Sequence, residues 1–129
     1  MSKALTQRQE KLKAQFIKDR GYWSDELWDA VLRMDPDFFE AYLNFSSVAC
    51  KKGPLPPKTV ELIAIAIDAS TTHLYAPGLR QHISNALKCG ATKEEIMQVL
   101  EIVSMLGIHT IVMGVPALME EMKKAGKRV

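Results

Sequence analysis

The segment THLYAPGLRQH, at residues 72–82, contains the side chains of this sequence that are best suited to chemistry. Two histidines, an arginine and a tyrosine lie there between two apolar segments. His82 follows Leu79 by three positions, so both lie on the apolar face of the helix that Pro77 is expected to start. Such a histidine is either a structural residue bonded to a polar neighbour or a neutral imidazole held for general acid/base catalysis. The spacing leaves both interpretations open.

The preceding segment, ELIAIAIDAS, carries two carboxylates and no other charged residue. Glu61 and Asp68 are seven residues apart, so in a helix they lie within about 20° of each other around the axis. A surface helix would hold them as a solvated strip. An interior helix must supply each of them with a partner, because an unpaired buried charge is costly. Both are therefore candidate site residues.

The junction between the two segments offers partners for these carboxylates. His73 and Tyr75 lie in or beside the connection, and Arg80 falls in the first turn of the next helix. An arginine close to a helix N-terminus would suit an anionic group of a substrate. Arg80 would equally well pair with one of the two carboxylates, and the sequence does not decide between these roles.

The histidine spacing does not indicate a metal site. His73 and His82 are nine residues apart across a helix boundary, and His109 belongs to a different predicted helix. None of them has the i, i+4 spacing that places two ligands on one helical face. No GxSxG motif and no glycine-rich phosphate loop occurs. We therefore expect neither a metal nor a cofactor.

The elements that must position these residues are predicted to be helices throughout. Apolar residues do not alternate with a period of two, whereas helix start and stop signals recur along the chain. Asp35 followed by Pro36 indicates one N-terminus, and Thr92 with Glu95 forms the capping box of another. Gly114 and Pro116 are expected to bend the last helix. The sequence predicts an all-α, compact domain of about six to seven helices. They are expected over about 5–19, over a short segment that opens at Ser24, from Pro36 to the Gly/Pro cluster KKGPLPP, over 57–70, from Pro77 to Gly90, over 93–107 and over 108–124.

Composition and charge exclude several classes of protein. Of the 129 residues 47% are hydrophobic and 25% are charged, and the formal net charge is +2. Because no basic face is evident, we expect no nucleic-acid partner. The apolar runs LIAIAI and IVMGVPALM are shorter than the ~20 residues that cross a bilayer, so we expect no membrane association. The N-terminus is polar, which predicts a cytoplasmic protein.

The two cysteines do not form a recognisable motif. Cys50 and Cys89 are 39 residues apart, a spacing that fits neither a redox CxxC pair nor a zinc knuckle. A cytoplasmic protein would keep both reduced. We interpret them as small apolar residues near helix ends.

The run PKTVELIAIAIDAS…LRQHISNALKCGATKEEIMQVLEIVSMLGIHT resembles the carboxymuconolactone decarboxylase family, which includes the alkylhydroperoxidase D branch. The shared pattern is a glutamate in an apolar helix, a histidine on the next helix, a GAT-x-EEI element and a glycine. Glu61, His82, residues 90–96 and Gly107 match it. The resemblance implies an alkylhydroperoxidase D-like fold with a lead-in over 1–52 and a family core over 57–125, in one domain spanning 1–129.

The redox branch carries Cys-x-x-Cys-x-x-x-His, in which a thiolate reduces a peroxide. Counting back from His82 places Tyr75 and Gly78 at the two cysteine positions. Cys89 lies seven residues beyond His82, without a second cysteine nearby. A hydroperoxide reductase that depends on a CxxC pair is therefore disfavoured.

The decarboxylase branch also lacks these cysteines and removes CO₂ from a γ-lactone acid. This resemblance implies that His82 and Glu61 are catalytic and that the substrate is a small lactone or organic acid. Arg80, His73, Tyr75 and Asp68 are the expected substrate-binding residues. A ligand-binding or scaffold protein without catalytic activity on the same fold is the alternative, so the sequence does not decide whether this protein is an enzyme. The family also implies a homo-oligomer, a trimer or a hexamer.

Overall fold

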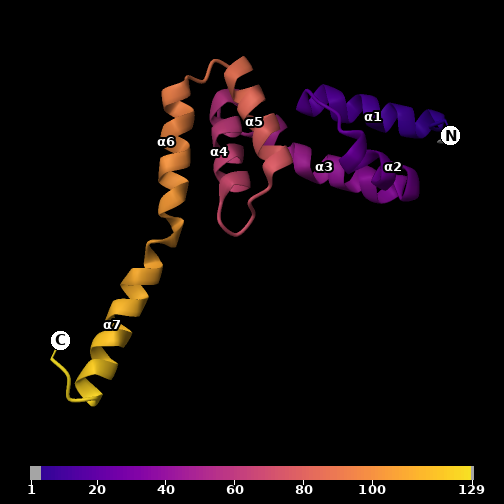
Figure 1. The fold of residues 1–129 in the computed structure, drawn as a ribbon. Coiled ribbons are helices and arrows are strands. Elements are labelled where there is room, and N and C mark those ends of the chain that lie inside the picture. The colour runs from indigo at the N-terminus through magenta and orange to yellow at the C-terminus, as the bar shows by residue number, and fades with distance from the viewer. Residues whose placement is uncertain (1–3, 129) are drawn as a thin grey trace. The chain divides into compact units, whose positions relative to one another are not determined.

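The computed structural model describes residues 4–128, apart from the side chain of Cys50. Within this range the chain is helical and contains no strand, which confirms the predicted all-α class (Figure 1). The α-helices are α1 (Gln7–Arg20), α2 (Ala30–Met34), α3 (Pro36–Lys52), α4 (Pro57–Ala69), α5 (Ala76–Lys88), α6 (Lys93–Ser104) and α7 (His109–Lys124). A π-helical turn over Asp25–Asp29 precedes α2, and a 3₁₀ turn, η2 (Met105–Gly107), joins α6 to α7.

The chain divides into two compact units, residues 1–60 and 61–129. The boundary falls inside α4, so the first turn of that helix belongs to one unit and the rest to the other. All the predicted site residues lie in the second unit. That both units form one domain stays a prediction.

The first unit is held together by an aromatic core. Phe16 of α1 and Phe39 of α3 are fully buried, and the rings of Tyr22, Trp23 and Trp28 lie within about 6 Å of that of Phe16. Edge-to-face and tilted pairs of this kind add to the free energy gained from burial. This unit carries none of the candidate site residues.

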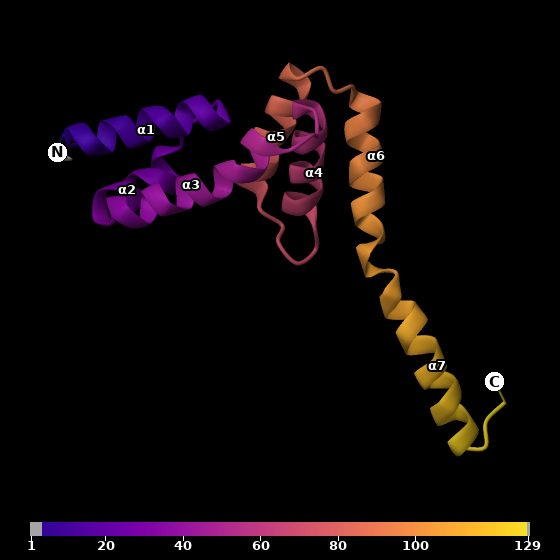
Figure 2. The same ribbon diagram turned by 180° about the vertical axis from the view of Figure 1, so that it is seen from behind.

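The second unit is built on α4, α5 and α6, which pack beside one another in both views (Figure 1 and Figure 2). Ile65 of α4, Ala86 of α5 and Ile96 of α6 form its buried core together with Ala91. The predicted capping box starts α6, because the backbone N–H of Glu95 donates to Thr92 Oγ1 over 3.1 Å and the Thr92 N–H donates to Glu95 Oε2 over 2.8 Å. Local signals therefore placed this helix start correctly.

The buried face of α4 differs from the apolar stripe that helical spacing predicts for this segment, namely Val60, Ile63, Ala64 and Ile67. Ile63 and Ile67 are exposed, whereas Ile65 and Asp68 are buried. The helix turns its carboxylates toward α5 and leaves two isoleucines uncovered within this chain. Hydrophobicity alone cannot distinguish a face that is covered by the same chain from one that needs a partner.

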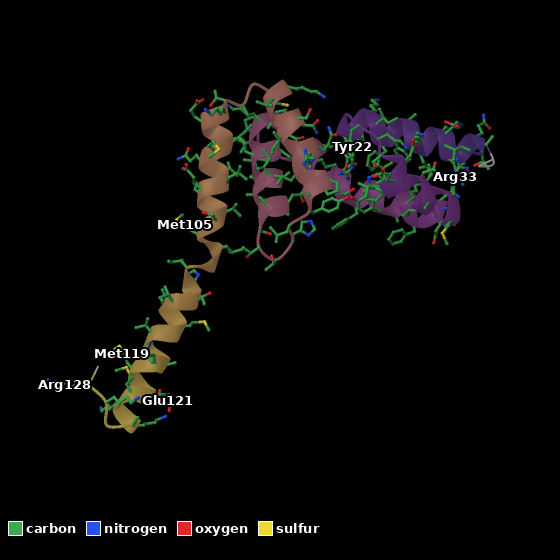
Figure 3. All side chains as sticks on the ribbon, in the orientation of Figure 1. Tyr22, Arg33, Met105, Met119, Glu121 and Arg128 are labelled. Atoms are coloured by element: carbon green, nitrogen blue, oxygen red, sulfur yellow. The ribbon has the colours of Figure 1, made fainter. Side chains whose placement is uncertain are left out.

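Helix α7 contains no buried residue among those described. It remains helical across Gly114 and Pro116, and the bend expected there stays a prediction. A clear change of direction occurs at η2, where tighter i→i+3 bonding interrupts the α-helical geometry (Figure 2). Methionines of this segment, among them Met105 and Met119, project from a helix that no other element covers (Figure 3).

One segment meets the length and composition of a membrane span, contrary to the expectation from the apolar runs. Within Lys93–Lys124 an 18-residue window has a mean hydropathy of 1.9, and none of that window is buried. Residues such as serine, threonine and glycine interrupt its apolar runs without adding charge. A helix that packs inside an assembly passes the same test, so this finding is weak evidence for a span.

Candidate functional site

Glu61 of α4 and His82 of α5 form the shortest contact of the predicted site. Glu61 Oε2 lies 2.7 Å from His82 Nδ1. The other carboxylate oxygen, Oε1, accepts a hydrogen bond from Asn85 Nδ2 over 3.4 Å. The His82 side chain is 25% exposed and the Glu61 side chain is 20% exposed, so both are at least three-quarters buried. A carboxylate on Nδ1 orients the ring and favours a proton there, so Nε2 becomes the exchangeable nitrogen.

Asp68 lies on the opposite side of the same imidazole. Its Oδ2 is 3.8 Å from His82 Nε2, and its Oδ1 is 3.4 Å from His73 Nε2. Asp68 is 8% exposed and its backbone carbonyl accepts the N–H of Tyr75 over 2.8 Å. Carboxylates and imidazoles therefore alternate in the order Glu61, His82, Asp68 and His73, which we call the carboxylate–imidazole chain.

Gly78 makes the position of Asp68 possible. A β-carbon at residue 78 would overlap Asp68 Oδ2 and lie 2.6 Å from Cδ1 of Tyr75. No real Cβ approaches other atoms so closely, so any larger residue must displace the carboxylate or the ring. The residue that stands in the second cysteine position of the redox branch is thus the one that admits a buried carboxylate beside His82.

Replacing Gly78 with alanine is expected to separate Asp68 from His82 and to destabilise the second unit by about 1–3 kcal/mol, as overpacking does. Thermal unfolding and a crystal structure of Gly78→Ala would measure the two effects. Gly107→Ala is the matched control, because a β-carbon there meets nothing within 4 Å. An unchanged Asp68 position in Gly78→Ala would contradict this account.

The junction between α4 and α5 brings His73 and Tyr75 next to each other. Their ring centroids are 5.5 Å apart, and the His73 side chain is 51% exposed. Leu74 between them has a positive φ of 47°, which turns the chain back toward α5. Tyr75 is the N-cap residue of α5. The predicted residues His73, Tyr75, Asp68, Glu61 and His82 therefore come together in one region.

Arg80 is the predicted site residue that the structure does not bring to this cluster. It is exposed, and within residues 4–128 it forms no ion pair with Glu61 or Asp68. Residues two positions apart in an α-helix point about 200° apart, so Arg80 and His82 face different sides of α5. A role for Arg80 as a clamp for an anionic group stays a prediction.

Among residues 4–128 no group of three or more histidine, cysteine or acidic side chains is arranged to hold a metal ion. His109, the third histidine, is exposed on α7. Cys89 is an exposed free thiol at the C-terminal end of α5. Cys50 lies in α3, and its side chain is outside the described part.

Sequence reasoning missed two contributors to the cluster. Asn85 donates to Glu61, and the available signal was its position one helical turn after His82. Gly78 was recognised only as a replaced cysteine. Its steric role depends on where Asp68 and Tyr75 meet in space, which spacing along the chain does not reveal.

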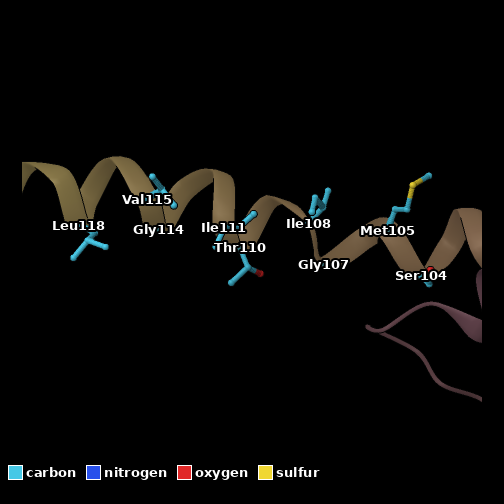
Figure 4. Close-up of a pocket in the computed structure, with 9 residues that line it drawn as sticks. All are labelled: Ser104, Met105, Gly107, Ile108, Thr110, Ile111, Gly114, Val115 and Leu118. Carbon is cyan, nitrogen blue, oxygen red and sulfur yellow. The ribbon is translucent and has the colours of Figure 1, made fainter. Parts of the chain in front are cut away.

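A hollow in the second unit lies along the bend between α6 and α7, and none of the predicted site residues lines it (Figure 4). Its volume is about 660 Å³. It is lined mainly by apolar residues, namely Ser104, Met105, Gly107, Ile108, Thr110, Ile111, Gly114, Val115 and Leu118. One helical segment supplies all of them, so the hollow is an apolar surface open to a partner.

Comparison with known proteins identifies a protein family and a related structure. The model of the carboxymuconolactone decarboxylase family matches residues 36–120, so the match also takes in α3. A crystal structure from Burkholderia xenovorans LB400, described as that of a candidate γ-carboxymuconolactone decarboxylase subunit, is 50% identical, with a TM-score of 0.87. The alignment covers 97% of this chain and 50% of that chain, so this chain spans about half its length. A search among curated proteins gives no match.

Proposed function

Because the chain belongs to the carboxymuconolactone decarboxylase family, we propose that it removes CO₂ from a small lactone acid or a related organic acid by acid/base catalysis. The observation that carries this proposal is the position of His82 between two carboxylates, with Glu61 2.7 Å from Nδ1. With Nδ1 held by Glu61, Nε2 is the nitrogen that can transfer a proton to a substrate.

The proposed reaction replaces the carboxylate of the substrate with a proton. The bond between the substrate carbon and its carboxylate breaks, CO₂ leaves, and the electron pair stays on that carbon. His82 Nε2 gives its proton to the carbon and becomes neutral, while Glu61 keeps the Nδ1 proton in place. Tyr75, which lies next to His73 at the start of α5, is the proposed contact for the substrate.

The region around His82 does not favour thiol-dependent redox chemistry. Tyr75 and Gly78 occupy the positions that the thiols of the redox branch would take, and Gly78 is packed against Asp68. Cys89 is exposed at the far end of α5 from the junction. A thiol-dependent peroxidase would need a thiolate beside His82.

We also propose that the protein is a homo-oligomer, a trimer or a hexamer, in the cytoplasm. The large apolar side chains of η2 and α7 are exposed, and a monomer rarely leaves an apolar surface of this extent uncovered. The solved relative is described as a subunit. Association between copies would cover this helix and remove the need for a membrane.

The proposed reaction is tested by incubating the protein with a panel of γ-lactone acids and keto acids. We expect CO₂ release from at least one lactone acid and no consumption of hydrogen peroxide with a thiol reductant. The variant with both Cys50 and Cys89 replaced by alanine should retain full activity. Tight binding of these acids without CO₂ release would instead favour the ligand-binding protein.

A further inference from the structure

Decarboxylation consumes a proton at each turnover, so the proposed acid must be reprotonated from water. His82 is about three-quarters buried and has Glu61 on one nitrogen and Asp68 near the other. The proton given to the substrate carbon leaves from Nε2, which is the nitrogen that faces Asp68. A route for its return must therefore pass that side of the ring.

The carboxylate–imidazole chain continues from this nitrogen toward solvent. Asp68 is buried, yet its second oxygen faces Nε2 of His73 at 3.4 Å. His73 is half exposed, so its remaining nitrogen can exchange protons with water. Within residues 4–128, Glu61 and Asp68 of α4 are the charged groups that face the His82 ring, and His73 of the junction lies behind Asp68.

We propose that Asp68 and His73 form a proton-delivery path that reprotonates His82 between turnovers, an inference that rests on the proposed function. A proton taken up from water by His73 passes from its Nε2 to the Asp68 carboxylate and from there to His82 Nε2. One proton enters from solvent for each proton that leaves on carbon. Asp68 returns to its starting state, and His73 returns to its neutral form as the Nδ1–H tautomer, which exchange with water converts back to the Nε2–H tautomer. Each transfer requires the atoms to approach to a hydrogen-bond distance of about 2.7–3.0 Å.

Gly78 contributes to the proton-delivery path because it leaves room for the Asp68 side chain. The carboxylate occupies space that a side chain at residue 78 would fill. Asp68 is therefore a positioning and transfer group of the path, and His73 is its proton donor on the solvent side. These roles differ from the substrate-binding roles that the sequence suggests for both residues.

The path separates two rates that a purely structural role would change together. In His73→Ala the first proton is already on His82, so the single-turnover rate of CO₂ release should stay close to that of the wild type. Steady-state kcat in dilute buffer should fall, by less than the roughly 10²–10⁴-fold expected for a residue that transfers the proton directly. KM should not change. Added imidazole should restore kcat, because it can carry protons to Asp68 in place of the missing ring.

His109→Ala is the matched control, because it removes an exposed histidine from α7 without touching the cluster. Equal steady-state rates for His73→Ala and the wild type would overturn the path, as would a loss that imidazole does not restore. If the wild type releases no CO₂ from any acid, the proposed function fails separately. In that case the ring ¹⁵N chemical shifts of His82 test the path. The path requires that His73→Gln changes these shifts and that His109→Gln does not. Unchanged shifts in His73→Gln would overturn the path.

Discussion

Replacing His82 with glutamine is expected to lower kcat for CO₂ release by roughly 10²–10⁴-fold, which is the usual contribution of a general acid or base. Glutamine can fill the space of the ring and donate a hydrogen bond to Glu61, but it cannot transfer a proton. The rate of CO₂ release at saturating substrate measures the effect. Substrate binding should change much less than kcat, because the proton is transferred only in the reaction step.

Two further variants make this test specific. His109→Gln removes a histidine by the same substitution outside the cluster and should keep the rate of the wild type. Glu61→Gln should reduce kcat less than His82→Gln does, because Glu61 orients the ring and does not touch the substrate carbon. A His82→Gln protein that keeps full activity would disprove the assignment of His82 as the acid.

The second large effect is expected on assembly. Replacing Ile111 and Leu118 with glutamate should convert the oligomer into monomers. These residues lie seven positions apart on one face of α7, line the hollow in Figure 4 and are each more than half exposed in this chain. In an assembly that covers the face, two unpaired carboxylates would be buried at a large cost.

Light scattering after size-exclusion chromatography would measure the mass of each protein. Lys123→Glu is the control, because it also adds negative charge to α7 but lies outside the residues that line the hollow. A wild type that is monomeric at all concentrations would show that the homo-oligomer is wrong. A double variant with the mass of the wild type would show that another surface forms the contact.

Local signals predicted most helix boundaries correctly because capping acts over a few residues. Asp35 accepts the backbone N–H of Phe38 over 2.8 Å at the start of α3, and Thr92 with Glu95 starts α6 as expected. The bend expected in α7 stays a prediction. Gly114 and Pro116 disfavour a helix locally, but the rest of that helix continues through them.

The faces of α4 show the limit of pattern reasoning. The stripe of isoleucine and alanine on α4 predicts a buried face, yet Ile63 and Ile67 are exposed in this chain. Apolar side chains indicate that a surface is to be covered, but they do not say whether the same chain or a second molecule covers it.

Some features of the candidate site follow from the sequence, and others follow only from the tertiary structure. The sequence by itself determined that Glu61 and Asp68 share a helical face and that His82 lies on the apolar side of the next helix, because helical periodicity is local. Only the tertiary structure decided that Glu61 meets Nδ1 while Asp68 faces Nε2 and that Arg80 stands apart. Glu61 and His82 are 21 residues apart, and the contact between them depends on how α4 packs against α5. The close approach at Gly78 depends on the same packing, which no spacing along one chain specifies.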